Sequence, residues 1–173
     1  MTSLTDSDLR RLNNLFKYDP DTGILTRKIT TSSRAIAGME VGCKAGNGYL
    51  VCRALGQLMY VHRIAMHLIL NSDFPDCFAV DHKNKNTTDN RRCNLRLLTN
   101  SENSHNRSLP GTGVYFSNRD SRWVAEIMLY GRKVVIGSSK TKEEAEAMYS
   151  NFKKSMEADL DIASELRIKE LSK

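Results

Sequence analysis

The 173-residue sequence is poor in aromatic residues and has a single tryptophan and only three prolines. No apolar stretch is long enough to cross a bilayer, and the start lacks the charged-then-apolar pattern of a secretion signal. The four cysteines, Cys43, Cys52, Cys77 and Cys93, form no Cys-x-x-Cys pair, which argues against a structural zinc site. A glycine-rich phosphate loop is also missing, which argues against a nucleotide-driven motor. We therefore expect a cytoplasmic protein with free thiols and a scaffold held by packing.

The charge is unbalanced toward the basic side. Lys and Arg number 26 against 20 Asp and Glu, which gives a formal net charge of +6. This excess favours a polyanionic partner without proving one. The length allows one domain or two small ones.

A pattern of polar residues between positions 81 and 103 is the most informative feature. Asp81 and His82 follow a short apolar run, Asn94 comes twelve residues after the histidine, and Asn103 nine further on. A histidine can take a proton from water near neutral pH, while carboxylate and amide oxygens suit a hard divalent cation. A second apolar run follows Asn94, and Thr99 or Asn100 could cap a helix that includes Asn103. The pattern predicts a strand, a loop, a strand and a helix that converge on one site.

At these residues the sequence resembles the HNH (His-Asn-His) endonucleases, in particular the phage-type homing enzymes whose third position is asparagine. The resemblance extends upstream. Residues 48–52 and 60–65 look like the hairpin and the "VHRLVA" helix that precede the site in that family, and residues 18–25 resemble a short opening motif. Several motifs in the family's order make the resemblance, over residues 16–107, more specific than an isolated Asp-His pair.

The resemblance implies a role for each position. His82 would be the general base, and Asp81 and Asn103 would hold one Mg²⁺ or Mn²⁺ ion that stabilises charge on the phosphate and the leaving oxygen. Asn94 would tie the loop together and hydrogen-bond the His82 imidazole, fixing its tautomer. Double-stranded DNA would be the partner. Candidate DNA contacts in this part of the chain are His62, Arg63 and Arg96.

Simpler interpretations stand beside these roles. Most asparagines of the stretch fit ordinary loop residues, and Asp81 and His82 could be a strand end whose polar groups satisfy local backbone. His62 and His67 lie in an apolar run and fit packing or backbone anchoring better than metal binding. His105 fits a surface or phosphate-contacting role.

A second module is expected after a linker at residues 108–113. Residues 114–116, 123–127 and 133–137 predict three strands. Thr141 and Glu144 fit a capping box of a helix in which Ala145, Met148, Tyr149 and Phe152 form one apolar face. The tail from residue 158 could continue the helix, pack on the body or mediate self-association.

Residues 111–157 resemble the DNA-binding domain of the plant APETALA/ethylene-response-factor class, with fewer arginines on the first strand. In that class the exposed sheet face enters the major groove. The resemblance implies a DNA-facing set, with Trp123 equally suited to be a core anchor. That set is Arg119, Arg122, Trp123, Glu126, Arg132 and Lys133.

The sequence therefore predicts an α+β protein with a ββα-metal nuclease core, followed by a small three-stranded antiparallel sheet packed on one helix. The expected domains are 1–107, with its core at 48–107, and 114–173. The expected function is metal-dependent DNA cleavage of the HNH homing type, in host cytoplasm if phage-encoded. The alternative is a non-catalytic DNA-binding regulator on the same scaffold, and monomer or homodimer stays open.

Overall fold

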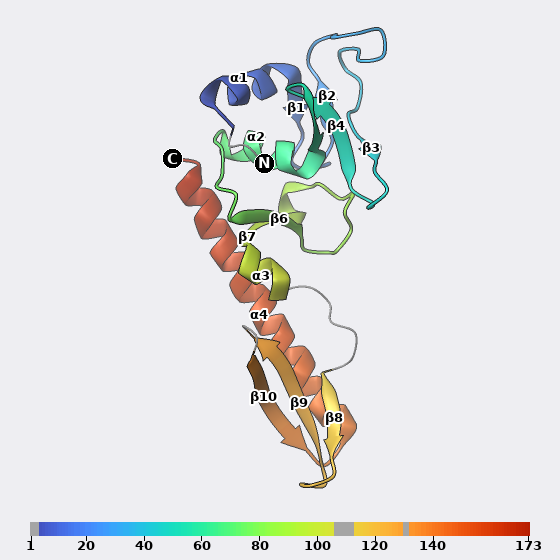
Figure 1. Ribbon diagram of the computed structural model, residues 1–173, viewed down its shortest axis with the longest axis vertical. Coiled ribbons are helices and arrows are strands. Elements are labelled where there is room, and N and C mark those ends of the chain that lie inside the picture. Colours follow the sequence, from blue (N-terminus) through green and yellow to red (C-terminus); the bar gives the residue numbers. More distant parts are fainter. Residues whose placement is uncertain (1–3, 106–112, 130–131) are drawn as a thin grey trace. The chain divides into compact units, whose positions relative to one another are not determined.

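The computed structural model describes residues 4–105, 113–129 and 132–173, and the chain divides into two compact units (Figure 1). The first unit contains the chain up to Leu98 together with Ser164–Lys173, and the second contains Thr99–Ala163. The expected linker at 108–113 lies outside the described residues except for Gly113. Among the described residues, no helix combines the length and the apolar character that crossing a membrane requires.

The first unit opens with helix α1 (Asp6–Leu15) and the antiparallel pair β1 (Phe16–Tyr18) and β2 (Leu25–Arg27). Thr5 and Asp8 form a capping box at the start of α1, because each accepts a hydrogen bond from the other's backbone N–H. On the apolar face of α1, Leu9 and Leu12 are buried and Leu15 is partly buried.

A three-stranded antiparallel sheet and a buried helix follow. The sheet has the order β3 (Cys43–Lys44), β4 (Leu50–Ala54), β5 (Gln57–Tyr60), and the chain passes directly into α2 (Val61–Leu70). Leu55 and Gly56 both have positive φ in the β4–β5 turn, as a two-residue hairpin of the type I′ form requires. The hairpin and helix expected from residues 48–65 are therefore confirmed.

The expected Asp-His strand and its partner are also present. β6 (Phe78–His82) pairs with β7 (Leu95–Thr99), and a loop ending in the short 3-10 helix η1 (Arg92–Asn94) joins them. The apolar side chains of these two strands pack with the second half of α2 in one core cluster. The first half of α2 packs with α1, β1, β2, β4 and β5 in another.

The last turns of α4 (Lys142–Leu171) complete this unit. Ser164 is fully buried and its Oγ accepts a 2.7 Å hydrogen bond from the backbone N–H of Leu97. Arg167 donates to the carbonyl oxygen of Leu97 at 3.1 Å, and Ile168 enters the core beneath β7. The tail thus continues the helix and packs on the body, the first and second of the three expected outcomes.

The second unit contains α3 (Asn100–His105), the strands β8 (Val114–Ser117), β9 (Arg122–Leu129) and β10 (Arg132–Ser139), and most of α4. The sheet is antiparallel in the order β10-β9-β8. α4 packs closely on it, because a Cβ at Gly137 would lie 2.9 Å from Met148 Sδ. The α+β class and the three-stranded sheet on one helix therefore agree with the sequence-based expectation.

Half of the capping box expected for α4 is present. Thr141 Oγ1 accepts from the backbone N–H of Glu144, but the Glu144 carboxylate accepts from Ser139 Oγ instead of from Thr141. On the apolar face, Ala145 is buried and Tyr149 and Phe152 are partly buried, whereas Met148 is 38% exposed.

Candidate active site

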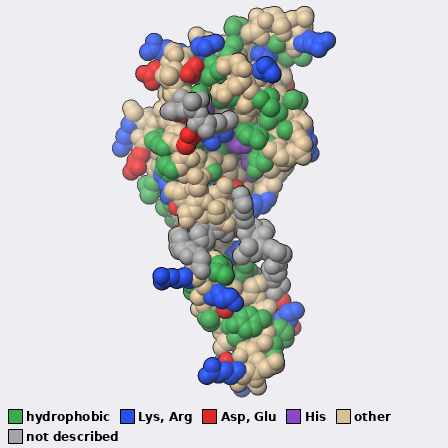
Figure 2. Space-filling model, in the orientation of Figure 1, with side chains coloured by type: hydrophobic (Ala, Val, Ile, Leu, Met, Phe, Trp, Pro, Cys, Tyr) green, Lys and Arg blue, Asp and Glu red, His purple; other side chains and the backbone are tan. Residues whose placement is uncertain are grey.

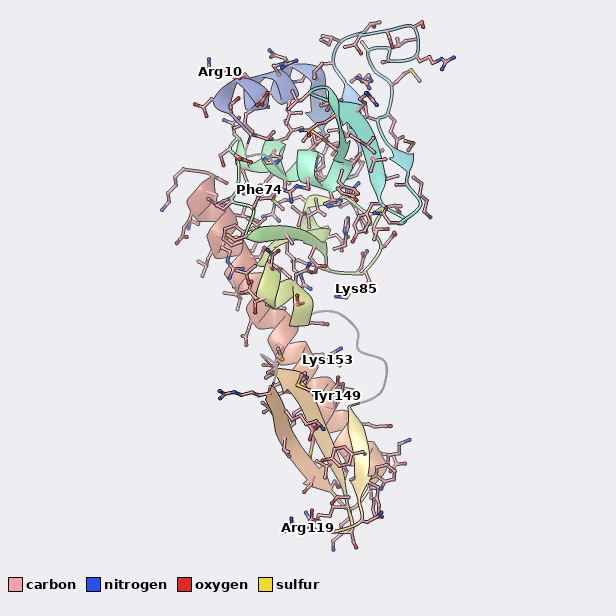
Figure 3. All side chains as sticks on the ribbon, in the orientation of Figure 1. Arg10, Phe74, Lys85, Arg119, Tyr149 and Lys153 are labelled. Carbon is pink, nitrogen blue, oxygen red and sulfur yellow. The ribbon has the colours of Figure 1, made fainter. Side chains whose placement is uncertain are left out.

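His82 occupies the last position of β6 and is 3% exposed. Its carbonyl oxygen accepts from the backbone N–H of Lys85, a residue in the left-handed region that turns the β6–β7 loop sharply (Figure 3). Alternation along the strand directs Asp81 to the other face of β6. The strand end therefore presents the two side chains on opposite sides, as expected.

Asn90, and not Asn94, pairs with the imidazole. His82 Nε2 lies 3.0 Å from Asn90 Oδ1, and Asn90 is 2% exposed. The expected Asn94–His82 hydrogen bond is wrong because Asn94 uses its amide within the loop. Its Oδ1 accepts from the backbone N–H of Asn84 at 3.0 Å, and its Nδ2 donates to the Asp89 carbonyl at 2.7 Å. The expectation that Asn94 ties the loop together is confirmed.

Asp89 adds a charged tie to the same loop. Its carboxylate accepts from Arg91 Nε at 2.8 Å and from Asn84 Nδ2 at 2.7 Å. The Arg91 hydrogen bonds hold the pKa of Asp89 well below its usual range. The loop therefore keeps this ion pair over the whole physiological pH range.

An aromatic cluster surrounds the imidazole. The ring of His62 meets that of His82 edge-on at 5.2 Å between centroids, and Tyr49 lies 5.1 Å from His62 and 5.9 Å from His82. Tyr60 stacks on His62 at 5.3 Å. These rings limit the orientations that the His82 side chain can adopt.

His62 is not positioned as a DNA contact, contrary to expectation. It is 6% exposed, and burial lowers its pKa to about 3, so the ring stays neutral. In the described part of the chain its Nδ1 is buried without a hydrogen-bond partner. Its position on the inward face of α2 matches the packing interpretation.

Arg96 also differs from its expected role. It is 2% exposed, and its Nε donates to Asp81 Oδ2 at 2.9 Å. A guanidinium this deeply buried requires an anionic partner, and Asp81 on the neighbouring strand supplies it. Arg96 is thus an internal counter-ion and not an exposed contact for DNA phosphate.

The oxygen donors still fit a hard cation. Asp81 is partly exposed and offers a carboxylate, although Arg96 engages one of its oxygens. Among the described residues no group of three His, Cys, Asp or Glu side chains could hold a metal ion, so a site here has to include amide oxygen. Asn103, the expected amide donor, lies on α3 in the second unit, capped by Thr99 as expected. Its partnership with Asp81 stays a prediction.

Arg63 and His67 belong to a neighbouring cluster around Phe74. The Arg63 guanidinium lies 4.7 Å from the centroid of the Phe74 ring, and His67 stacks on that ring at 4.4 Å. His67 Nδ1 lies 3.3 Å from the Ser72 carbonyl, and burial lowers its pKa. His67 therefore has the backbone-anchoring role expected of it, while DNA contact by the half-buried Arg63 stays a prediction.

The opening motif at residues 18–25 packs directly on the segment that carries Asn90. The Tyr18 hydroxyl donates to the Asn90 carbonyl at 2.7 Å, and the backbone N–H of Arg92 donates to the Pro20 carbonyl at 2.9 Å. Gly23 has φ +75°, and a Cβ there would lie 2.4 Å from Arg91 N. The motif thus supports the backbone around Asn90, the site residue that the sequence did not identify.

On the second unit, strand alternation separates the expected DNA-facing set. Arg122, Glu126 and Lys133 lie on the sheet face away from α4, and Lys133 Nζ pairs with Glu126 at 3.2 Å. Arg119 lies in the exposed β8–β9 turn (Figure 3).

Trp123 and Arg132 fall on the opposite face. Trp123 is partly buried, meets Phe116 edge-on at 5.4 Å, and has Lys142 of α4 over its ring. Trp123 therefore matches the core-anchor alternative.

Comparison with known proteins bears on the first unit. Residues 59–105 match the family described as HNH endonuclease. A protein of Acanthamoeba polyphaga mimivirus, described as an uncharacterized HNH endonuclease, is 32% identical over 106 residues. The matched stretch is 60% of this chain and 56% of the relative, so the chain spans just over half of that protein's length. No solved structure matches the chain. The stretch that carries His82, Asn90 and Asn94 is therefore similar to HNH endonuclease domains.

Proposed function

We propose that this protein is a metal-dependent DNA endonuclease of the HNH homing type that hydrolyses one phosphodiester bond per active site. The observation that carries the proposal is the hydrogen bond from His82 to Asn90 within a segment that matches the HNH family. In the tautomer in which His82 Nε2–H donates a hydrogen bond to Asn90 Oδ1, Nδ1 of the same ring keeps its lone pair. A general base requires such a fixed, unprotonated nitrogen.

His82 would take a proton from the attacking water. The oxygen of that water forms a bond to phosphorus while the bond to the sugar oxygen breaks, and the departing oxygen is later protonated. The aromatic cluster of Tyr49, Tyr60 and His62 holds the imidazole in place during this transfer. Asn94 is a positioning residue, because its two hydrogen bonds close the β6–β7 loop.

Asp81 and Asn103 would supply oxygen ligands to Mg²⁺ or Mn²⁺. When bound, the cation would stabilise negative charge on the phosphate and on the departing sugar oxygen. Arg96 orients the Asp81 carboxylate through the 2.9 Å hydrogen bond from its Nε.

The sheet of the second unit would bind DNA beside the cut. Arg119, Arg122 and Lys133 offer positive charge at the exposed turn and on the face away from α4. Arg and Lys at such positions suit phosphate oxygens and guanine edges. One active site per chain predicts a nick from a monomer, and a double-strand break would require two active sites or two turnovers.

The test is cleavage of phage or genomic DNA by the purified protein with Mg²⁺ or Mn²⁺, with EDTA controls and sequencing of the new ends. We expect metal-dependent cuts that a His82→Ala variant loses by a factor of about 100 or more. His67→Ala is the matched control, because this buried histidine lies in the Phe74 cluster away from His82. Equal cleavage by wild type and His82→Ala would refute the proposal.

A non-catalytic DNA-binding protein is the second candidate, and the Arg96–Asp81 ion pair favours it. A guanidinium already neutralises the carboxylate that a metal would need. Calorimetric titration with Mn²⁺ separates the two candidates. Heat of binding that Asp81→Asn abolishes supports the nuclease, whereas DNA binding without Mn²⁺ binding and without cleavage supports the regulator.

A further inference from the structure

A basic surface lies in the first unit outside the candidate active site. Two adjoining cavities, of about 280 and 340 Å³, share Arg27 and Arg53 in their linings, and Arg34 lines the first of them. Figure 1 shows the long β2–β3 connection at one end of this unit and the β6–β7 pair at the other. The cavities border that connection, so they belong to neither His82 nor its neighbours.

The connection is a hydrogen-bonded structure of its own. The backbone N–H of Arg27 donates to Met39 O at 2.9 Å, and that of Gly38 donates back to Arg27 O at 2.8 Å. Nearer the tip, Thr30 Oγ1 accepts from the backbone N–H of Ala37, and a bridge joins Ser32 to Ala35. Arg34 is therefore carried at the tip of a closed turn whose backbone is fixed before any ligand arrives.

Positive charge is concentrated here. Residues 22–60 contain five Lys and Arg but only one Asp or Glu, Glu40, so this segment carries +4 of the chain's net +6. Within the described residues, Arg27, Arg34 and Arg53 form no ion pair with a carboxylate, although Glu40 lines the first cavity. The Arg27 guanidinium instead lies over the Phe16 ring at 5.6 Å. Figure 2 shows blue basic and green apolar side chains over this connection at the upper right.

The chemistry of the three side chains points to phosphate. A guanidinium presents a planar set of donors that pairs with phosphate oxygens, and grouped arginines without carboxylate partners repel one another until an anion binds. Ile36 and Met39, exposed by 47% and 49%, give the same surface apolar patches that suit the sugars between phosphates.

We propose that Arg27, Arg34 and Arg53 form a second contact with the sugar-phosphate backbone of duplex DNA, away from the cut. The proposal rests on the proposed function in one respect, that DNA is the substrate. It adds sequence-independent DNA binding by the N-terminal part of the first unit. This binding would persist in a variant whose active site is inactive.

The first test maps arginine protection. The full-length protein is modified with phenylglyoxal, an arginine-specific reagent, in EDTA with and without a random-sequence DNA duplex, and modified peptides are quantified by mass spectrometry. We expect DNA to slow modification of Arg27, Arg34 and Arg53 but not of Arg10, which is exposed on α1 (Figure 3). Unchanged modification of the three arginines overturns the proposal. Protection by inorganic phosphate or single-stranded RNA but not by the duplex overturns it as well.

The second test measures the salt dependence of binding. The triple variant replaces Arg27, Arg34 and Arg53 with glutamine. It is expected to make the negative slope of log K against log salt shallower by about 2 to 3. The matching triple lysine variant keeps the charge and is expected to keep the slope, while Arg10→Gln is the single-site control. An unchanged slope in a triple glutamine variant with native circular dichroism contradicts the proposal.

The two proposals fail in different ways. Protected arginines and a reduced salt slope without any metal-dependent cleavage would leave the basic surface standing and remove the nuclease. Cleavage that His82→Ala abolishes, with unprotected arginines, would remove only the basic surface.

Discussion

The hydroxyl of Tyr18 donates a 2.7 Å hydrogen bond to the carbonyl oxygen of Asn90, whose side chain pairs with His82. Two residues that are 72 positions apart thus act on one imidazole, since Tyr18 fixes the backbone from which the Asn90 amide extends. Burial raises the pKa of Tyr18, so its hydroxyl stays protonated as a donor. The opening motif therefore has a role in the geometry of the candidate active site as well as in folding.

Asn90→Ala should lower the single-turnover rate of DNA cleavage by about 100-fold, because His82 loses the partner that fixes its tautomer. The variant should also lose about 1–3 kcal/mol of unfolding free energy, since a buried ring nitrogen is left unsatisfied. Asn86→Ala is the control, because Asn86 is exposed and bonds only within the loop. Equal rates for the two variants would show that Asn90 does not orient the base.

Gly23→Ala should destabilise the first unit by about 2–4 kcal/mol, measured by urea unfolding. The residue has positive φ, and the new Cβ would lie 2.4 Å from Arg91 N and 2.6 Å from Asn90 C. Gly38→Ala is the matched control, with a similar φ of +84° but nothing within 4 Å of the new Cβ, so only backbone strain of about 1 kcal/mol is expected there. Similar losses in both variants would mean that the close approach to the Asn90 segment has no cost.

His62 should make the protein sensitive to mild acid. Its pKa is lowered in the folded state to about 3 from 6.5, so below pH 6.5 the unfolded chain binds a proton that the folded protein does not. Stability is then fully present above pH 6.5 and falls as the pH drops toward 3. Between pH 6.5 and 5 the loss is about 2 kcal/mol. His62→Phe removes this contribution, so thermal unfolding midpoints of the variant should vary less with pH than those of the wild type. Parallel pH curves would contradict the burial argument.

Ser164→Ala should lower the unfolding free energy by about 1–3 kcal/mol, because the buried N–H of Leu97 loses its acceptor. Ser155→Ala is the control on an exposed position of the same helix, where alanine is neutral or slightly favourable. Hydrogen exchange provides a direct measurement. The Leu97 amide should exchange faster in Ser164→Ala and at the wild-type rate in Ser155→Ala.

Much of the fold follows from local patterns in the sequence. The strand ending in Asp81 and His82, the hairpin before α2, and the three strands of the second unit each have a short apolar run bounded by turn residues. The position of residues 164–173 could not be derived in the same way, because Leu166 and Ile168 fit several kinds of packing. Only the tertiary structure shows that the backbone N–H of Leu97 donates to Ser164 and that its carbonyl oxygen accepts from Arg167.

The candidate site was harder to assign residue by residue. His82 and Asp81 stand out by their place after an apolar run, but seven asparagines lie between residues 84 and 106, and spacing alone does not distinguish Asn90 from its neighbours. Burial distinguishes it, at 2% exposed. Arg96 illustrates the same limit, since a charged residue in a strand next to a site suggests DNA contact until its buried carboxylate partner is known.

The contribution of residues 164–173 to the first unit sets an order of events during synthesis. Because the chain leaves the ribosome from its N-terminus, the first 98 residues emerge before the helix that supplies Ser164 and Ile168 has been translated. Until then the Leu97 edge of β7 has neither its side-chain partners nor its apolar cover. The candidate nuclease unit therefore reaches its full set of contacts only after the second unit has been translated. A nascent chain that ends before Ser164 would carry His82 in a unit that lacks the last turns of α4.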